Sequence, residues 1–115
     1  MNIIAKSSSV TSAHDLYVLT QAPDREKLTT AKGAILTLAS WVIYTDVNSN
    51  GDEITLMAMT TDDGKAYCTN SGTFCKDFGN ATEMYKQFGE EFTKIQVVTG
   101  VSKNGREYIT CKVVE

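Results

Sequence analysis

The sequence predicts a mainly β domain in which five strands and one inserted helix follow an N-terminal helical extension, in the order β-β-β-α-β-β. Runs rich in β-branched and aromatic residues, which are typical of strands, alternate with Asn-Gly and Asp-Gly turns. One segment instead repeats its apolar residues at helical spacing. The 115 residues suit a single domain, with 1–32 as the extension and 33–115 as a five-stranded barrel or curled antiparallel sheet.

The extension is expected to contain a short helix over residues 11–22. Thr11 or Ser12 can cap its start. Pro23 ends it, because the residue before a proline avoids the helical region. The charged and polar residues 24–32 are compatible with a loop or with another helical turn.

Three strands joined by tight turns are expected next, at residues 34–46, 53–61 and 65–69. The first of them is long enough to bend. The two turns contain Asn50-Gly51 and Asp63-Gly64, whose residues tolerate positive φ. These turns predict antiparallel neighbours along the chain.

The inserted helix is expected over residues 73–88. Asn70 or Ser71 can cap its start, and Gly89 suits its end. Two further strands, joined by the turn Ser-Lys-Asn-Gly, are expected at 92–101 and 106–114. Three strands, a helix and two strands is the chain order of an OB-fold, a partly open barrel that binds oligonucleotides and oligosaccharides. An open sheet with a helix on one face has the same order.

The sequence contains no recognisable arrangement for catalysis or for binding a cofactor. His14 is the only histidine, and Cys68, Cys75 and Cys111 lack the paired short spacings of a zinc site. Residues 46–53 are similar to the first half of a calcium loop, but Met57 stands where the closing glutamate should be. We therefore expect a non-enzymatic protein with no metal and no cofactor.

Composition favours a cytoplasmic protein without a membrane partner. There is no apolar run of membrane-spanning length and no secretory signal, and the odd cysteine count suits a reducing compartment. The net charge is −3, but residues 93–115 carry four bases against two acids, whereas residues 46–63 carry five acids and no base. A local basic strip can attract a polyanion even on an acidic protein, because salt screens distant charges.

Strand alternation predicts a face that combines aromatic rings with cations. It places Tyr108 with Lys112, and Tyr67 with Lys65, on common faces of their strands. In the long first strand, either Trp41 or Tyr44 is expected to point away from the core, although packing in the core is an alternative for both. Rings stack on bases and cations neutralise phosphates, so the predicted nucleic-acid contacts are Lys65, Tyr67, Lys94, Gln96, Lys103, Arg106, Tyr108, Lys112 and Trp41.

Residues 54–112 carry a family resemblance. Val-Val-Thr-Gly leads into the turn Ser-Lys-Asn-Gly and an aromatic strand, and the earlier Thr-Thr-Asp-Asp-Gly-Lys-Ala-Tyr precedes a helix. In this order and spacing the stretch resembles the single-stranded DNA-binding proteins of small tailed phages of Gram-positive bacteria. The sequence departs from that pattern at Val101, and it has no acidic tail of the kind through which bacterial single-strand-binding proteins recruit partners.

The resemblance implies an OB-like protein that coats displaced single strands during phage DNA replication in the bacterial cytoplasm. It implies DNA contacts at Tyr67, Lys94, Lys103, Arg106, Tyr108 and Lys112, and it is compatible with self-association along DNA. A different hypothesis is a phage-encoded interaction module or inhibitor that binds a host protein through the acidic stretch 46–63.

Overall fold

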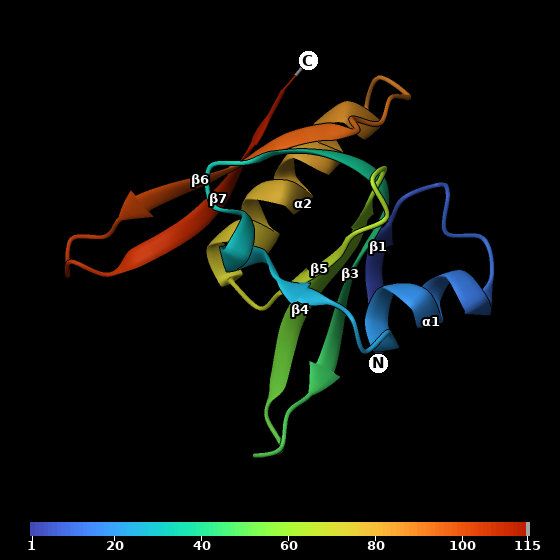
Figure 1. The fold of residues 1–115 in the computed structure, drawn as a ribbon, viewed down its shortest axis with the longest axis horizontal. Coiled ribbons are helices and arrows are strands. Elements are labelled where there is room, and N and C mark those ends of the chain that lie inside the picture. The colour runs from blue at the N-terminus through green and yellow to red at the C-terminus, as the bar shows by residue number, and fades with distance from the viewer. Residues whose placement is uncertain (115) are drawn as a thin grey trace.

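The computed structural model describes residues 1–114; Glu115, the last residue of the expected domain, lies outside them. Within this range a seven-stranded sheet curls around one helix, and a second helix lies outside the curl (Figure 1). The elements are β1 (Asn2–Lys6), α1 (Ala13–Gln21), β2 (Glu26–Lys27), the 3-10 turn η1 (Leu28–Ala31), β3 (Ile35–Val47), β4 (Glu53–Thr61), β5 (Ala66–Thr69), α2 (Gly72–Lys86), β6 (Lys94–Val101) and β7 (Glu107–Val113).

The long strand β3 organises the sheet. One edge of β3 pairs with β4 along most of its length. β3 also pairs at its beginning with β6, through residues 35–37, and nearer its end with β1, through residues 42–45. β3 therefore has β6 beside its beginning and β1 beside its later part. Because these two partners continue the sheet from different parts of one long strand, the sheet curls into a half-barrel.

The half-barrel is open between its edge strands, β2 and β7. In the described chain, β5 pairs with β4 and with the short parallel strand β2, and β7 pairs with β6 alone. A cleft of about 450 Å³ lies at this opening, and its lining includes Thr69 at the end of β5, Ser71 at the start of α2 and Tyr108 of β7. The fold is thus mainly β, with a strongly curled open sheet that is compatible with an OB-like domain.

The main core lies between the concave side of the sheet and α2. Phe74 and Phe78 of α2 are fully buried, and the ring of Phe78 meets Trp41 edge-on at 4.9 Å and Phe92 at 5.1 Å between centroids. α2 packs against β7 and β4, as its position inside the curl in Figure 1 indicates. This core holds β6 and β7 in place from their inner side.

A second, smaller core lies on the outer side of β3 and β4, beneath α1. Val10 and Leu19 there cover Val42, Tyr44 and Ala58. Ser12 caps α1 by accepting a hydrogen bond from the backbone N–H of Asp15 at 3.1 Å. The N-terminal segment therefore covers part of the convex face of the sheet.

The predicted elements are present, with small differences at their ends. The strand predicted over 53–61 has those bounds, whereas β5 and β6 begin at Ala66 and Lys94, one and two residues later than expected. α2 begins at Gly72 and ends at Lys86, before Phe88, because Gly89 adopts a positive φ of 68° and its N–H bonds back to the carbonyl of Lys86. The sequence patterns missed β1 and β2, so the first 32 residues are not only helical.

Candidate nucleic-acid interface

The outer face of the β6–β7 hairpin carries most of the predicted contact residues. In the antiparallel register Gln96 lies opposite Lys112, and Gly100 lies opposite Tyr108, so these side chains share one face. Ile95 and Val97 alternate with them and enter the core. The predicted alternation of both strands is confirmed.

The beginning of β3 extends this outer face. Ile35 lies opposite Gln96, and Thr37 lies opposite Lys94. The side chain of Ile35 is 57% exposed, and the amide of Gln96 donates a hydrogen bond of 3.3 Å to the carbonyl of Gly33. The side chain of Ile35 and the amide of Gln96 thus lie next to Lys94 and Lys112. The sequence patterns did not single out Ile35.

The turn at the end of the hairpin presents two cations. Ser102 and Arg106 close it, with the Ser102 N–H donating to the Arg106 carbonyl at 2.8 Å and the Arg106 N–H donating to the Ser102 hydroxyl at 3.2 Å. Gly105 supplies the positive φ of 76° that the turn requires. The side chains of Lys103 and Arg106 are exposed beside this hydrogen-bonded turn.

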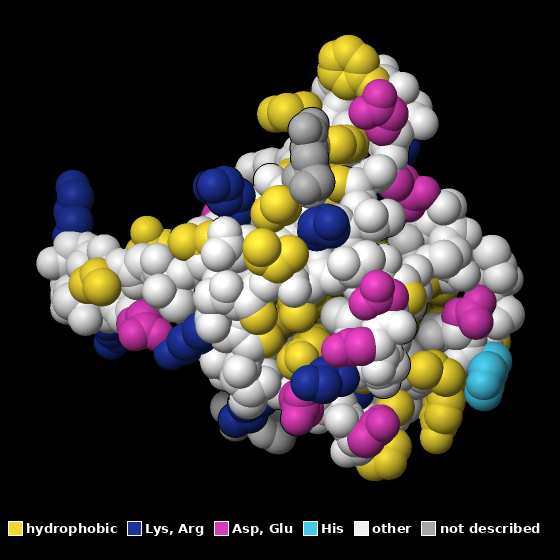
Figure 2. Space-filling model, turned by 45° about the horizontal axis from the view of Figure 1, so that its top comes forward, with side chains coloured by type: hydrophobic (Ala, Val, Ile, Leu, Met, Phe, Trp, Pro, Cys, Tyr) yellow, Lys and Arg dark blue, Asp and Glu magenta, His cyan; other side chains and the backbone are white. Residues whose placement is uncertain are grey.

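The charge on this part of the molecule is mostly positive. In Figure 2 the hairpin is the arm at the left, and Lys and Arg side chains flank it and the adjoining face. Glu107 is the one acid within β6 and β7, and it lies on the other face, in an ion pair with Lys32. Thr110, which alternates onto the same face as Tyr108 and Lys112, donates a hydrogen bond from its hydroxyl to Asp77 of α2, so one carboxylate adjoins this face.

Tyr108 is the one ring of the predicted set that is exposed on the sheet. Its side chain is 39% exposed, and it lies across Gly100 of the neighbouring strand. The sequence patterns did not single out Gly100. Counting outward from a turn at residues 102–105 would have placed Thr99 opposite Tyr108; the closing pair in the structure is Ser102 and Arg106, and it is this register that places Gly100 there.

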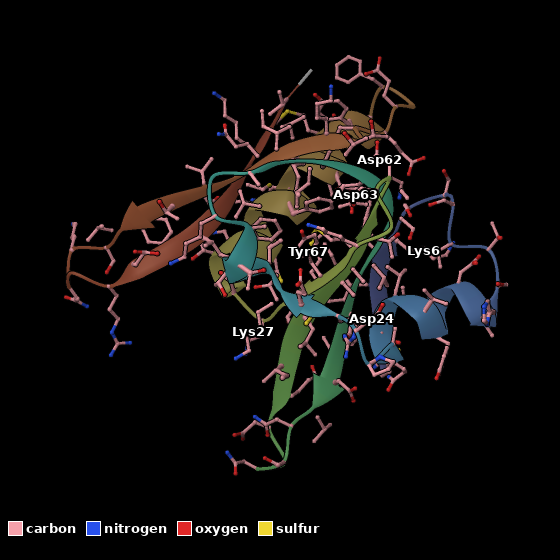
Figure 3. The ribbon with its side chains drawn as sticks, viewed as in Figure 1. Lys6, Asp24, Lys27, Asp62, Asp63 and Tyr67 are labelled. Carbon is pink, nitrogen blue, oxygen red and sulfur yellow. The ribbon has the colours of Figure 1, made fainter. Side chains whose placement is uncertain are left out.

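Trp41 and Tyr67 are corrections to the predicted contacts. They are only 4% and 5% exposed, and both belong to the main core. Tyr67 lies opposite Met59 and points into the curl, as Figure 3 shows, because the concave side of the sheet is the buried side. As predicted, Tyr44 points to the opposite side of β3 from Trp41, but α1 covers it there. Neither ring is therefore available for stacking on a base.

Lys65 is exposed but lies apart from the other cations. It follows the β4–β5 turn, where its N–H donates to Asp63 at 3.3 Å. Asp62 and Asp63 appear in Figure 3 on the side of the molecule away from the β6–β7 arm. Lys65 therefore belongs to the surroundings of an acidic turn rather than to the basic hairpin.

The acidic stretch does not form one surface. Asp52 and Glu53 lie at the beginning of β4, and Asp62 and Asp63 follow its end, with the nine-residue strand between them. Asn48 uses its side-chain oxygen to accept the N–H groups of Asn50 and Asp52 at 2.9 and 3.0 Å, as a turn residue does. Among residues 1–114, no group of three or more metal-ligating side chains converges.

The cysteines are separate thiols in the described chain. Burial raises the pKa of Cys75 and of Cys111 to about 11, so both remain protonated at neutral pH. His14 is exposed on α1 next to Tyr17, far along the chain from any cysteine.

No protein-family model, no curated protein and no solved structure matches this chain. In residues 1–114 neither helix has the length and apolar character needed to cross a bilayer.

Proposed function

We propose that this chain is a non-enzymatic protein that binds single-stranded DNA without sequence preference across the outer face of β6 and β7. The observation that carries the proposal is the placement of Tyr108, Lys112 and Lys94 on one face, next to the cationic turn at Lys103 and Arg106. A single strand exposes base faces and phosphates together. A ring can stack on a base while cations beside it neutralise the phosphates.

The path of the DNA follows from what covers the rest of the sheet. OB-folds commonly bind oligonucleotides on the face of their second and third strands and through two loops. In this chain α1 covers part of the corresponding outer face, over Val42, Tyr44 and Ala58. The β3–β4 turn carries Asp52 and Glu53, which repel phosphate. These features favour a path along the β6–β7 hairpin and the beginning of β3.

The resemblance of residues 54–112 to phage single-stranded DNA-binding proteins supports the biological part of the proposal. Such a protein would coat displaced strands during phage DNA replication in the host cytoplasm, with self-association along the strand. The alternative hypothesis, an inhibitor that binds a host protein through an acidic surface, has less support. The acidic residues lie at the two ends of β4 and do not form one continuous surface.

A direct test is an electrophoretic shift of oligo-dT, matched duplex DNA and single-stranded RNA in low salt. The proposal predicts that oligo-dT binds at least as tightly as RNA and more tightly than the duplex, whose stacked bases cannot reach Tyr108. The matched variants are Lys103→Ala/Arg106→Ala and, as a control with the same charge change, Lys76→Ala/Lys86→Ala on α2. Failure of the unmodified protein to shift any of the three probes would refute the proposal.

A further inference from the structure

We propose that Gly100 is a positioning residue whose missing side chain provides a seat for the ring of Tyr108, so that the ring becomes a fixed stacking platform for one base. This inference rests on the proposed function. It adds the residue that orients Tyr108, the exposed aromatic ring of the β6–β7 face. It concerns how Tyr108 is held rather than the contact that Tyr108 itself makes.

The close approach of the two residues is the first step. Gly100 and Tyr108 face each other in the antiparallel pair. A Cβ atom on Gly100 would lie 2.5 Å from the Cζ of Tyr108, 2.6 Å from its Oη and 2.9 Å from its Cε2. Such distances are shorter than real carbon contacts, so any side chain at position 100 displaces the ring.

The backbone does not require glycine at this position. Five glycines have positive φ, at residues 33, 51, 64, 89 and 105, and Gly100 is not among them. It lies inside β6 with extended pairing on its β7 side. Alanine can adopt this backbone without strain, so the close contact with the ring is what distinguishes the position.

The seat has a consequence for binding. A tyrosine on an exposed strand normally samples more than one side-chain rotamer, and ordering it upon binding costs free energy. A ring already lying over Gly100 avoids most of that cost. Lys112 shares its face and Arg106 precedes it by two residues, so a base stacked on Tyr108 has cations on both sides for its phosphates.

The space beside the ring is open. Tyr108 borders the cleft of about 450 Å³ at the opening of the half-barrel, whose polar lining includes Thr69, Asn70 and Ser71 together with the ion pair of Lys32 and Glu107. The ring remains 39% exposed although it lies over the backbone of β6. A base or sugar can therefore approach the ring without movement of the sheet.

A ring over a glycine on the facing strand can also serve only to stabilise the sheet. The two roles differ in their coupling to DNA binding. If Gly100 acts through Tyr108, replacing Gly100 has no further effect on affinity once the ring has been removed. If it acts on the strand, the two effects add.

The experiment is a double-mutant cycle with fluorescein-labelled oligo-dT at constant low salt, using Gly100→Ala, Tyr108→Leu and the double variant. We expect Gly100→Ala and Tyr108→Leu each to weaken binding roughly tenfold, the value of about one stacked base, and the double variant to equal Tyr108→Leu. Tyr108→Phe should bind nearly as the unmodified protein does. Thr99→Ala, next to Gly100 but on the opposite face, is the matched control and should leave affinity unchanged.

A spectroscopic measurement tests the seat without DNA. The Gly100 Hα resonances should be shifted upfield by the ring, and Tyr108→Leu should abolish that shift. An unchanged affinity of Gly100→Ala, or additive effects in the cycle, would overturn the role of Gly100 while leaving DNA binding intact. Failure of the unmodified protein to bind oligo-dT would overturn the proposed function and the platform together.

Discussion

Removal of the two cations at the end of the hairpin should change the salt dependence of DNA binding by a calculable amount. The face of β6 and β7 and its turn offer four cations to phosphate, namely Lys94, Lys103, Arg106 and Lys112. For a single strand, the slope of log K against log salt is about −0.7 for each neutralised phosphate, which gives a slope of about −2.8 for four contacts.

The variant Lys103→Ala/Arg106→Ala keeps two of these cations, so its slope should be about −1.4. Between about 50 and 200 mM salt, the affinity of the unmodified protein should fall about 50-fold and that of the variant about 7-fold. Fluorescence anisotropy of labelled oligo-dT over a salt series measures both slopes. The hydrogen bonds that close the turn come from the backbone and Ser102, so these substitutions leave its conformation in place.

The control variant Lys76→Ala/Lys86→Ala has the same net charge as the hairpin variant. Its slope of log K against log salt should nevertheless equal that of the unmodified protein. Both lysines are exposed on α2, and both line hollows that Ile4 and Ala5 of β1 also line. Equal slopes for the hairpin variant and the unmodified protein would contradict the reasoning. Equal reductions in the hairpin variant and the control would show that overall charge, rather than this surface, governs binding.

Three further predictions concern the folded state. Phe78→Ala removes a fully buried ring and should lower the free energy of unfolding by about 3–5 kcal/mol in urea denaturation, whereas a loss below about 1 kcal/mol would contradict the described core. With pKa values raised to about 11, Cys75 and Cys111 should react with Ellman's reagent at pH 8 far more slowly in the folded protein than in urea; equal rates would be inconsistent with their burial. Hydrogen bonds from Ser8 lower the pKa of Glu91, so this carboxylate stabilises the fold above pH 4.5 and loses that contribution as pH falls through its lowered pKa; Ser8→Ala should reduce this acid dependence of the melting temperature, and an unchanged dependence would count against the contact.

The candidate surface was predictable where it depends on local geometry. Residues alternate across a strand with a period of two, and a short turn sets the register of the strands it joins. Alternation is therefore sufficient to place Tyr108 and Lys112 on one face of β7, but the register needs the closing pair Ser102 and Arg106, which places Tyr108 opposite Gly100 and Lys112 opposite Gln96. The Asn-Gly and Asp-Gly pairs similarly located both turns around β4.

The buried aromatic residues were not predictable in the same way. Alternation separates Trp41 from Tyr44, but which side of β3 is covered depends on α2 inside the curl and on α1 outside it. The strand β1 was missed because it is five residues long and has no hairpin turn; its partner, residues 42–45, lies about forty positions further along the chain.

The sequence by itself determined the mainly β character of this protein, the order of its principal strands and helix, and the alternation that places cations and Tyr108 together. Those properties depend on turn chemistry and on contacts between neighbouring segments. Only the tertiary structure decided that the half-barrel remains open, that Tyr67 and Trp41 are core residues, and that α1 covers one outer face. These outcomes depend on the burial of apolar surfaces that lie far apart in the sequence. A local sequence pattern does not indicate which of these surfaces pack against each other.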